Sequence, residues 1–183
     1  MRIISGRQRA TKLSSPEGET TRPTSDRARE SLFSILSSGK WQDILKQGRI
    51  ADIYAGTGSF GLEALSRGAS FCSFIETDKN ALDCLRQNIE NCHQRINTRV
   101  VTQSALHPAK ATLPYDVVFI DPPYGKDLSG QTLDVLVQAN WIDHDSLIIV
   151  QMHPKEDLDL ADTYRGIDER RYGAGKFLFL ELI

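Results

Sequence analysis

The sequence has few of the features that mark membrane, secreted or metal-binding proteins. Its longest apolar runs are too short to cross a bilayer. Met1–Gly6 is not a signal peptide, because charged Arg2 is followed by no long apolar core. The three cysteines are an odd number at spacings that match no metal-binding pattern, and the four histidines form no ligand spacing. We therefore expect a cytoplasmic protein with no metal and no membrane partner.

The chain also lacks internal repeats and low-complexity tracts, and its 183 residues fit one domain. We expect a monomer in which residues 1–21 extend a core of residues 22–183. The net charge is only −2, but residues 1–29 hold seven Lys/Arg and three Asp/Glu, whereas the other residues hold 15 and 21. This basic segment is either a solvated arm or a patch that grips phosphate, and charge alone leaves both open.

Strands and helices alternate from residue 50, a pattern typical of a parallel sheet covered by helices. A helix is expected to begin after a cap at Thr24 or Ser25 and to end at Gly39. Further helices are expected at 60–67, 78–92 and 128–139, and strands at 50–55, 71–76, 99–102, 116–120, 147–150, 168–171 and 176–183. The last two strands flank a glycine-rich turn and form an antiparallel hairpin. The sequence therefore predicts an α/β, Rossmann-like fold with a mostly parallel seven-stranded sheet and helices on both faces. A small basic β-hairpin is expected over residues 2–13.

The first strand of this pattern runs into Gly56-Thr57-Gly58-Ser59-Phe60-Gly61, a G-x-G-x-x-G turn that opens a helix. Such glycines permit a tight turn and a close approach of the backbone to a nucleotide. Glu76 follows Gly56 by twenty residues, where an acid can accept hydrogen bonds from a ribose diol. These features suit an NAD enzyme as well as a methyltransferase. Asp52, inside the strand, favours the methyltransferase. In methyltransferases an acid at this position reaches the amino-acid end of the cofactor, whose ammonium needs a negative partner.

A second motif, Asp121-Pro122-Pro123-Tyr124, follows the apolar strand Val117–Ile120. Two prolines stiffen the backbone at the strand end, where ligands bind in open α/β sheets. If Asp121 and the carbonyl of Pro122 accept the two N–H bonds of a base amine, its lone pair can turn toward a methyl donor. Tyr124 would stack on the base, and Asp121 would help to remove the proton. This motif resembles the fourth motif of amino-methyltransferases, which act on adenine, cytosine, guanine or glutamine nitrogens.

A longer sequence motif before the first predicted strand indicates which methyltransferase family the chain resembles. The residues from Arg22 to Phe33, RPTSDRARESLF, are similar to the R-P-T-x-D-x-x-R-E-x-L-F signature of bacterial 16S ribosomal RNA guanine-N2 methyltransferases of the RsmD type. The likeness extends over nearly the whole chain, from Arg2–Gly6 through the glycine turn to the Asp-Pro-Pro-Tyr motif. It implies a class I methyltransferase that uses S-adenosylmethionine and modifies guanine 966 of 16S RNA within the small subunit. The chain departs from the family at Ser104-Ala105, where Asn or Asp usually precedes Ala, and at Gln151–His153, which lack an acid.

These patterns together give a set of candidate residues. The catalytic candidates are Asp121, Pro122, Pro123 and Tyr124. The cofactor-binding candidates are Asp52, Tyr54, Gly56, Gly58, Gly61, Glu76, Ser104, Ala105, Arg22 and Thr24, with residues 22–30 closing over the cofactor. The RNA-binding candidates are Arg2, Arg7, Arg9, Lys12, Arg27 and Arg29. The arginines of the helix could be solvated surface charges, but Arg27 and Arg29 gather near a helix start that should face the cofactor, which favours a functional role.

Other functions remain open at this point. A DNA or RNA adenine-N6 methyltransferase shares the motifs, but a DNA enzyme would need a recognition region for which the chain leaves no room. A protein-glutamine methyltransferase would favour Asn over Asp at position 121. A non-catalytic ribosome assembly factor would tolerate loss of Asp121 or Tyr124, and both are present. An NAD-linked oxidoreductase would need an acid and a base for hydride transfer, which nothing here supplies.

Overall fold

The computed structural model describes residues 1–16, 26–123, 128–172 and 175–183. Its strands are β1 (Arg49–Ile53), β2 (Phe71–Ile75), β3 (Thr98–Val101), β4 (Val117–Ile120), β5 (Leu147–Met152), β6 (Tyr164–Tyr172) and β7 (Gly175–Leu182). Its α-helices are α1 (Asp26–Leu36), α2 (Ser59–Ser66), α3 (Lys79–Asn91) and α4 (Leu128–Gln138), with short 3-10 turns η1 (Gly39–Trp41) and η2 (Arg95–Asn97). In this part of the chain no helix is long and apolar enough to span a membrane.

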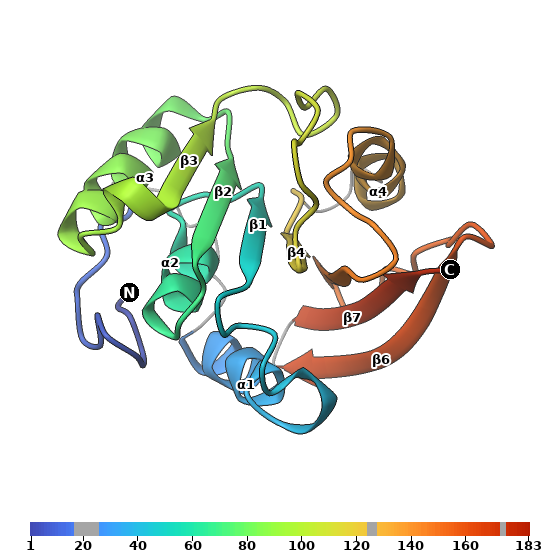
Figure 1. The fold of residues 1–183 in the computed structure, drawn as a ribbon, viewed down its shortest axis with the longest axis horizontal. Coiled ribbons are helices and arrows are strands. Elements are labelled where there is room, and N and C mark those ends of the chain that lie inside the picture. The colour runs from blue at the N-terminus through green and yellow to red at the C-terminus, as the bar shows by residue number, and fades with distance from the viewer. Residues whose placement is uncertain (17–25, 124–127, 173–174) are drawn as a thin grey trace.

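All seven strands form one sheet in the order β3-β2-β1-β4-β5-β7-β6. The first five pair in parallel, and β7 pairs antiparallel with both β5 and β6. The predicted fold is thereby confirmed, including the antiparallel hairpin at the carboxyl end. Figure 1 shows the sheet between α2 and α3 on one side and α4 on the other, with β6 and β7 at the opposite end from the amino-terminal segment.

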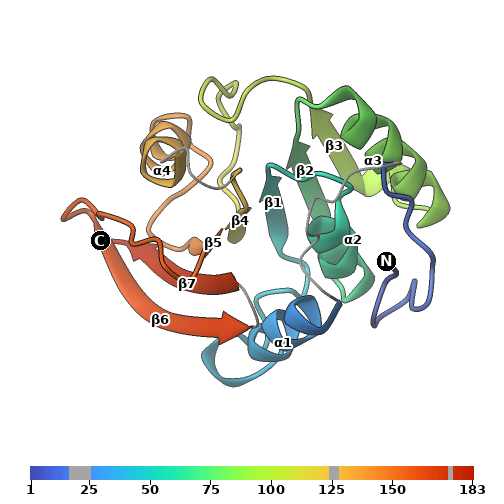
Figure 2. The ribbon, with the colours of Figure 1, turned by 180° about the vertical axis from the view of Figure 1, so that it is seen from behind.

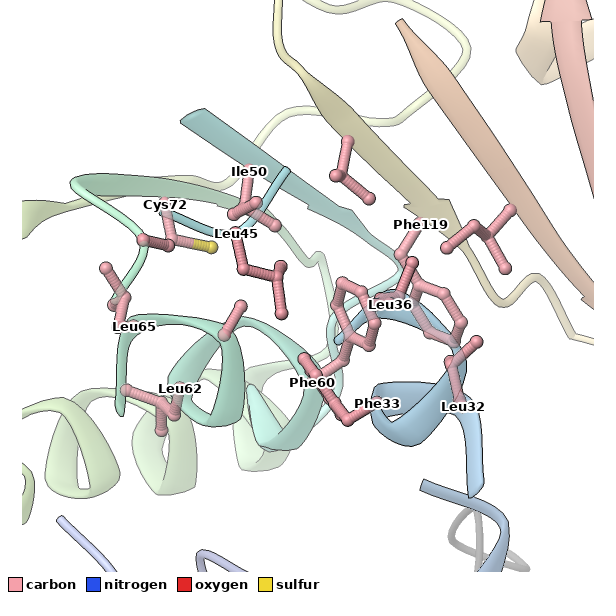
Figure 3. Packing of buried hydrophobic residues seen from close by; sticks show 14 of the residues in the cluster. Leu32, Phe33, Leu36, Leu45, Ile50, Phe60, Leu62, Leu65, Cys72 and Phe119 are labelled. Carbon is pink, nitrogen blue, oxygen red and sulfur yellow. The ribbon is translucent and has the colours of Figure 1, made fainter. Parts of the chain in front are cut away.

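Each face of the sheet has its own apolar core, because alternate residues of a strand point to opposite faces. One face packs against α1, α2 and α3, and the other against α4 and the segment that precedes β4. A stack of three rings joins the first core: Phe33 of α1 lies 5.1 Å from Phe60 of α2, and Phe60 lies 4.1 Å from Phe119 of β4, between ring centroids. Figure 3 shows these rings meeting between the two helices and the sheet. Helices therefore cover both faces, as predicted.

The amino-terminal residues 1–16, here called the arm, double back on themselves without forming two regular strands. A single antiparallel bridge joins Arg2 to Lys12, and Ile3 N–H donates to the carbonyl of Thr11. The predicted hairpin is thus only partly correct. Ile3 and Leu13 are buried in the core shared with α1 and α2, so the arm is fixed by packing rather than by a strand ladder. Figure 2 shows the arm beside α2 and α3 from behind.

Candidate active site

The two sequence motifs lie at neighbouring strand ends. β1 and β4 pair in parallel, with Ile53 opposite Ile120, so the residues that follow each strand leave the same edge of the sheet side by side. The N–H of Asp121 continues this ladder by donating to the carbonyl of Ile53 at 3.2 Å. From β1 the strand order runs to β3 in one direction and to β4 and β5 in the other. In open α/β sheets ligands bind outside the strand ends at such a change of direction. The region outside the carboxyl ends of β1 and β4 is here called the crevice.

The three glycines of the turn Gly56–Gly61, here called the glycine turn, serve different purposes. Gly56 has a φ of +54°, and a Cβ at this position would meet nothing within 4 Å. A Cβ at Gly61 would lie 2.4 Å from the ring of Phe74 and 2.5 Å from the sulfur of Cys72. Gly58 combines a φ of +77° with a Cβ position only 2.3 Å from Leu85. Gly56 therefore opens the turn toward a ligand, whereas Gly58 and Gly61 let it pack closely on β2 and α3.

Glu76, at the end of β2, already holds the glycine turn. One carboxylate oxygen accepts a hydrogen bond from Gly56 N–H at 2.7 Å, and the other accepts from the N–H groups of Thr77 and Asp78 at 2.6 and 2.7 Å. The side chain is only half-buried. Its carboxylate therefore stands at the mouth of the turn with lone pairs available for the hydroxyls of a ribose.

Asp52 lies beneath the glycine turn, and its carboxylate accepts a hydrogen bond from Gly61 N–H at 2.9 Å. The residue is 2% exposed. Burial is the main cause that raises the pKa of Asp52 to about 8, with the negative charges of Asp121 and Glu76 adding to it. Burial also raises the pKa of Asp121 to about 7. Asp52, Glu76 and Asp121, here called the three site acids, thus lie close enough together for the charges of Glu76 and Asp121 to act on Asp52.

The proline motif is only partly within the described residues. Pro122 is buried and Pro123 is exposed, so the first proline anchors the corner in the core while the second faces outward. Tyr124 lies outside the described residues, as do Arg22 and Thr24, so their predicted roles remain predictions.

The remaining cofactor candidates take different positions. Tyr54 has a φ of +61°, and its hydroxyl shares a 2.8 Å hydrogen bond with the hydroxyl of Thr132 on α4. Ser104 is exposed beyond the end of β3, where its hydroxyl accepts from Leu106 N–H at 3.2 Å. Ala105 is buried in the core on the α4 side of the sheet. Tyr54 is therefore tied to α4, and Ser104 is the more accessible of the pair after β3.

Comparison with known proteins identifies the family to which the chain is similar. The model of the family described as conserved hypothetical protein 95 matches residues 1–181. Two relatives bear the name ribosomal RNA small subunit methyltransferase D. The Escherichia coli K12 protein is 35% identical over 159 residues, which cover 86% of this chain and 77% of that protein. The Haemophilus influenzae protein is 34% identical over 178 residues, which cover 94% and 89%. The chain belongs to the RsmD-type methyltransferase family.

Solved structures agree with this membership. The Escherichia coli protein yhhF, named as a methyltransferase, superposes with a TM-score of 0.84 at 32% identity over 100% of this chain and 97% of that one. A protein from Thermus thermophilus gives a TM-score of 0.81 at 28% identity, covering 100% and 99%. A Pyrococcus horikoshii protein at 16% identity has a TM-score of 0.73, which shows the Rossmann-like methyltransferase fold alone.

Membership in the RsmD-type family implies S-adenosylmethionine as the methyl donor, and the crevice fits this group. The donor carries a sulfonium and an ammonium, both positive, and a ribose with two hydroxyls. The three site acids can supply the opposite charge, because a cation beside a buried carboxyl group favours its ionised form. Gly56 leaves room for the backbone to approach a nucleoside, and Glu76 stands beside it. Among the described residues, no group of His, Cys, Asp and Glu is arranged to hold a metal ion.

The basic candidates of this family member lie on the arm and on α1. Arg2, Arg7, Arg9, Lys12 and Arg27 are all exposed. A cavity of about 560 Å³ lies between the arm and the start of α1, and Arg2, Arg9 and Arg27 line it together with two acids of α1. The exposed cations therefore form a surface on the arm and α1, and three of them line this cavity.

The structure contradicts the predicted RNA contact of Arg29. Its side chain is 1% exposed, and its Nη2 donates to the carbonyl of Arg2 at 2.5 Å and to the carboxylate of Asp26 at 3.0 Å. Burial lowers its pKa, while the negative charges of Asp26 and Glu63 oppose that shift. A guanidinium enclosed in this way cannot reach a phosphate, so Arg29 joins α1 to the arm instead.

Sequence reasoning missed two buried polar side chains that hold the site together. Glu63 of α2 is 0% exposed and accepts hydrogen bonds from Ile4 N–H at 2.7 Å, Ser5 N–H at 3.0 Å and Arg67 Nε at 2.7 Å. Asn88 of α3 is also 0% exposed and contacts both the arm and the glycine turn. The one available signal was a polar residue on the apolar face of a helix, which the sequence alone gives no partner for.

Proposed function

We propose that this protein transfers a methyl group from S-adenosylmethionine to the exocyclic N2 amine of guanine 966 in 16S ribosomal RNA, within the small ribosomal subunit. It acts as a monomer in the cytoplasm, with all 183 residues forming one domain. The observation that carries the proposal is the position of Asp121 beside the glycine turn, at the ends of two paired strands. The names of the Escherichia coli and Haemophilus influenzae relatives support a ribosomal RNA substrate.

The corner after β4 supplies the chemistry of amine recognition. When bound, S-adenosylmethionine provides a methyl group made electrophilic by its sulfonium. The lone pair of a guanine N2 amine is delocalised into the ring, so the amine is a poor nucleophile. Asp121 and the carbonyl of Pro122 accept the two N–H bonds of this amine and orient its lone pair. Holding reacting atoms in line in this way supplies several kcal/mol of the acceleration.

Asp121 has a second role that its environment permits. Burial raises its pKa to about 7, so near neutral pH the carboxylate can take up the proton that nitrogen loses as its bond to the methyl carbon forms. Tyr124 is proposed to stack on the base. Glu76 is proposed to bind the ribose hydroxyls and Asp52 the ammonium of the donor. Ser104 and the backbone of Ala105 are proposed to contact its adenine, and Arg22 and Thr24 to cover it.

The exposed basic surface is proposed to hold the RNA. Arg2, Arg7, Arg9, Lys12 and Arg27 lie on the arm and on α1, where guanidinium and ammonium groups are free to meet phosphates. This contact would fix the register of the RNA, whereas the crevice would select the amine.

Transfer of tritium from labelled donor to small subunits of a strain that lacks the enzyme tests the proposal, with mapping of the modified base. We expect label at N2 of guanine 966. Asp121→Ala should lower the transfer rate at least about 100-fold, the size of a lost general base, while leaving donor affinity within a few-fold. Glu76→Ala should weaken donor binding first. Label on another base, or an active Asp121→Ala variant, would refute the proposal.

A further inference from the structure

The arm is fastened to the methyltransferase core by its backbone. Glu63 accepts from the N–H groups of Ile4 and Ser5, and the hydroxyl of Ser66 donates to the carbonyl of Ser5 at 2.5 Å. Arg7 N–H donates to the carbonyl of Ser66 at 2.8 Å. Because these bonds join main-chain groups to a helix of the core, the arm cannot shift without breaking several of them.

The far end of the arm is held by a different side chain. The Oδ1 of Asn88 accepts from Ser14 N–H at 2.7 Å, and its Nδ2 donates to the carbonyl of Ser14 at 3.0 Å. These two bonds clamp one residue of the arm on both sides of its Cα. Ser14 itself is exposed, so its side chain has no part in the clamp.

The same amide also reaches the glycine turn. The second N–H of Asn88 Nδ2 donates to the carbonyl of Thr57 at 3.0 Å. Thr57 lies between Gly56, whose N–H is held by Glu76, and Gly58, which packs on Leu85. Both N–H donors of Asn88 are thereby used, and a buried amide with every donor satisfied fixes its neighbours strongly.

We propose that Asn88 is a positioning residue that couples the arm to the glycine turn, so that the cofactor and the RNA each strengthen binding of the other. The RNA half of this statement rests on the proposed function. A ligand that fixes the carbonyl of Thr57 also fixes the amide of Asn88, which in turn holds Ser14. Such coupling is reciprocal, because the free energy that links two binding sites is the same in both directions.

Hydrogen exchange of the arm amides with and without S-adenosylhomocysteine, the demethylated donor, tests the coupling. In the wild-type protein the ligand should slow exchange at Ser14 about 5-fold or more, the lower end of coupling between linked sites. In Asn88→Ala the ligand should slow exchange at Ser14 by no more than about 2-fold. Calorimetry on the same samples measures how well each protein binds S-adenosylhomocysteine. A purely structural role would speed exchange equally in both states and leave the factor unchanged.

Two further variants separate the coupling from a general loss of stability in the exchange experiment. Gln87→Ala removes a neighbouring exposed amide of α3 that bonds only to Asn91 in the described structure, and it should retain the full factor. Asn88→Asp can still accept from Ser14 N–H, and once its carboxyl group is ionised it has no proton to donate to Thr57. Measured at a pH above the pKa of that carboxyl group, it should lose the factor even if the alanine variant unfolds. Ligand-dependent protection of Ser14 that persists in Asn88→Asp would overturn the coupling alone. Failure of the wild-type protein to bind the ligand would overturn the proposed function and the coupling with it.

Discussion

Asp52 carries a buried carboxyl group whose charge depends on what fills the crevice. Its pKa of about 8 exceeds the ordinary value of 3.8, chiefly because of burial. The unfolded chain loses this proton near pH 4, whereas the folded protein keeps it up to about pH 8. Across this window the free energy of unfolding falls as the pH rises. A cation bound in the crevice supplies the opposite charge and therefore favours the ionised form of Asp52 over the protonated one.

Cofactor affinity should therefore depend on pH. From pH 6 to 8 the affinity of the wild-type protein for S-adenosylhomocysteine should rise about 10-fold or more, since binding of its ammonium must displace a proton from Asp52. Asp52→Asn removes the titrating group and should flatten the rise. Calorimetry in buffers of different ionisation enthalpy measures the protons released. An equally steep rise in the asparagine variant would assign the effect to another group.

Without ligand the same substitution should have a stabilising effect. The neutral amide of Asp52→Asn avoids the cost of a buried charge, so the variant should melt several degrees above the wild-type protein at pH 8 and near it at pH 5. Thermal unfolding at the two pH values measures this difference. A wild-type protein more stable than the variant at pH 8 would show that the carboxylate has a favourable partner there.

Single residues were predictable where the backbone alone decides their position. Glu76 and Asp121 follow strands, and the ends of parallel strands share one edge of the sheet, so their placement follows from the pattern. Arg29 lies on a helix, where the neighbours of a side chain depend on which segment covers it. The arm covers Arg29, and nothing in the sequence reveals that packing.

At the scale of elements, the arm depends on one glycine at its docking point. Gly6 has a φ of +86°, and a Cβ there would lie 1.9 Å from the backbone carbonyl oxygen of Ser66. Neither the conformation nor the space admits a side chain, so the contact between the arm and α2 requires glycine.

Gly6→Ala should therefore displace the arm. We expect a loss of about 1–3 kcal/mol in the free energy of unfolding, as for other overpacked sites, and faster proteolysis within residues 1–16. Denaturant unfolding and limited proteolysis measure the two effects. Gly166→Ala is the matched control, because its Cβ would meet nothing within 4 Å and its φ is not positive. Equal behaviour of the two variants would mean that the arm adapts to a side chain.

The elements themselves were largely predictable. The spacing of apolar residues distinguishes strands from helices, and glycine and proline mark where they end. The described strands differ from the predicted ones mainly in length, as in β6, which begins at Tyr164 rather than at Asp168. The arm was not predictable in detail. It is held by the packing of Ile3 and Leu13 and by hydrogen bonds to Glu63 and Asn88, which lie far away in sequence, so no local pattern encodes its shape.

For the whole molecule, the uneven distribution of charge supports the proposed RNA contact of the arm and α1. The basic excess of residues 1–29 lies in a chain that is otherwise acidic. Contacts between exposed cations and phosphates release counterions, so the logarithm of the affinity should fall with the logarithm of the salt concentration. The acidic remainder limits binding of RNA elsewhere on the surface.

Alanine at both Arg7 and Arg9 should weaken RNA binding and reduce the salt slope by about 1–2, close to one unit for each lost phosphate contact. Binding of 16S RNA fragments at several salt concentrations measures the slope. The exposed Arg95 of η2 offers a control elsewhere on the surface, and its replacement by alanine should leave the slope unchanged. An unchanged slope in the double variant would exclude the arm as the RNA contact.

The position of β7 has a consequence for synthesis of the protein. β7 is last in sequence but lies between β5 and β6, and its residues Phe177, Phe179 and Leu180 are buried. During translation, a nascent chain that has not yet exposed residues 175–182 leaves β5 as an open, apolar edge that can pair with other chains. The sheet can be completed only once this strand has emerged, so until then the growing polypeptide is exposed to aggregation through the β5 edge.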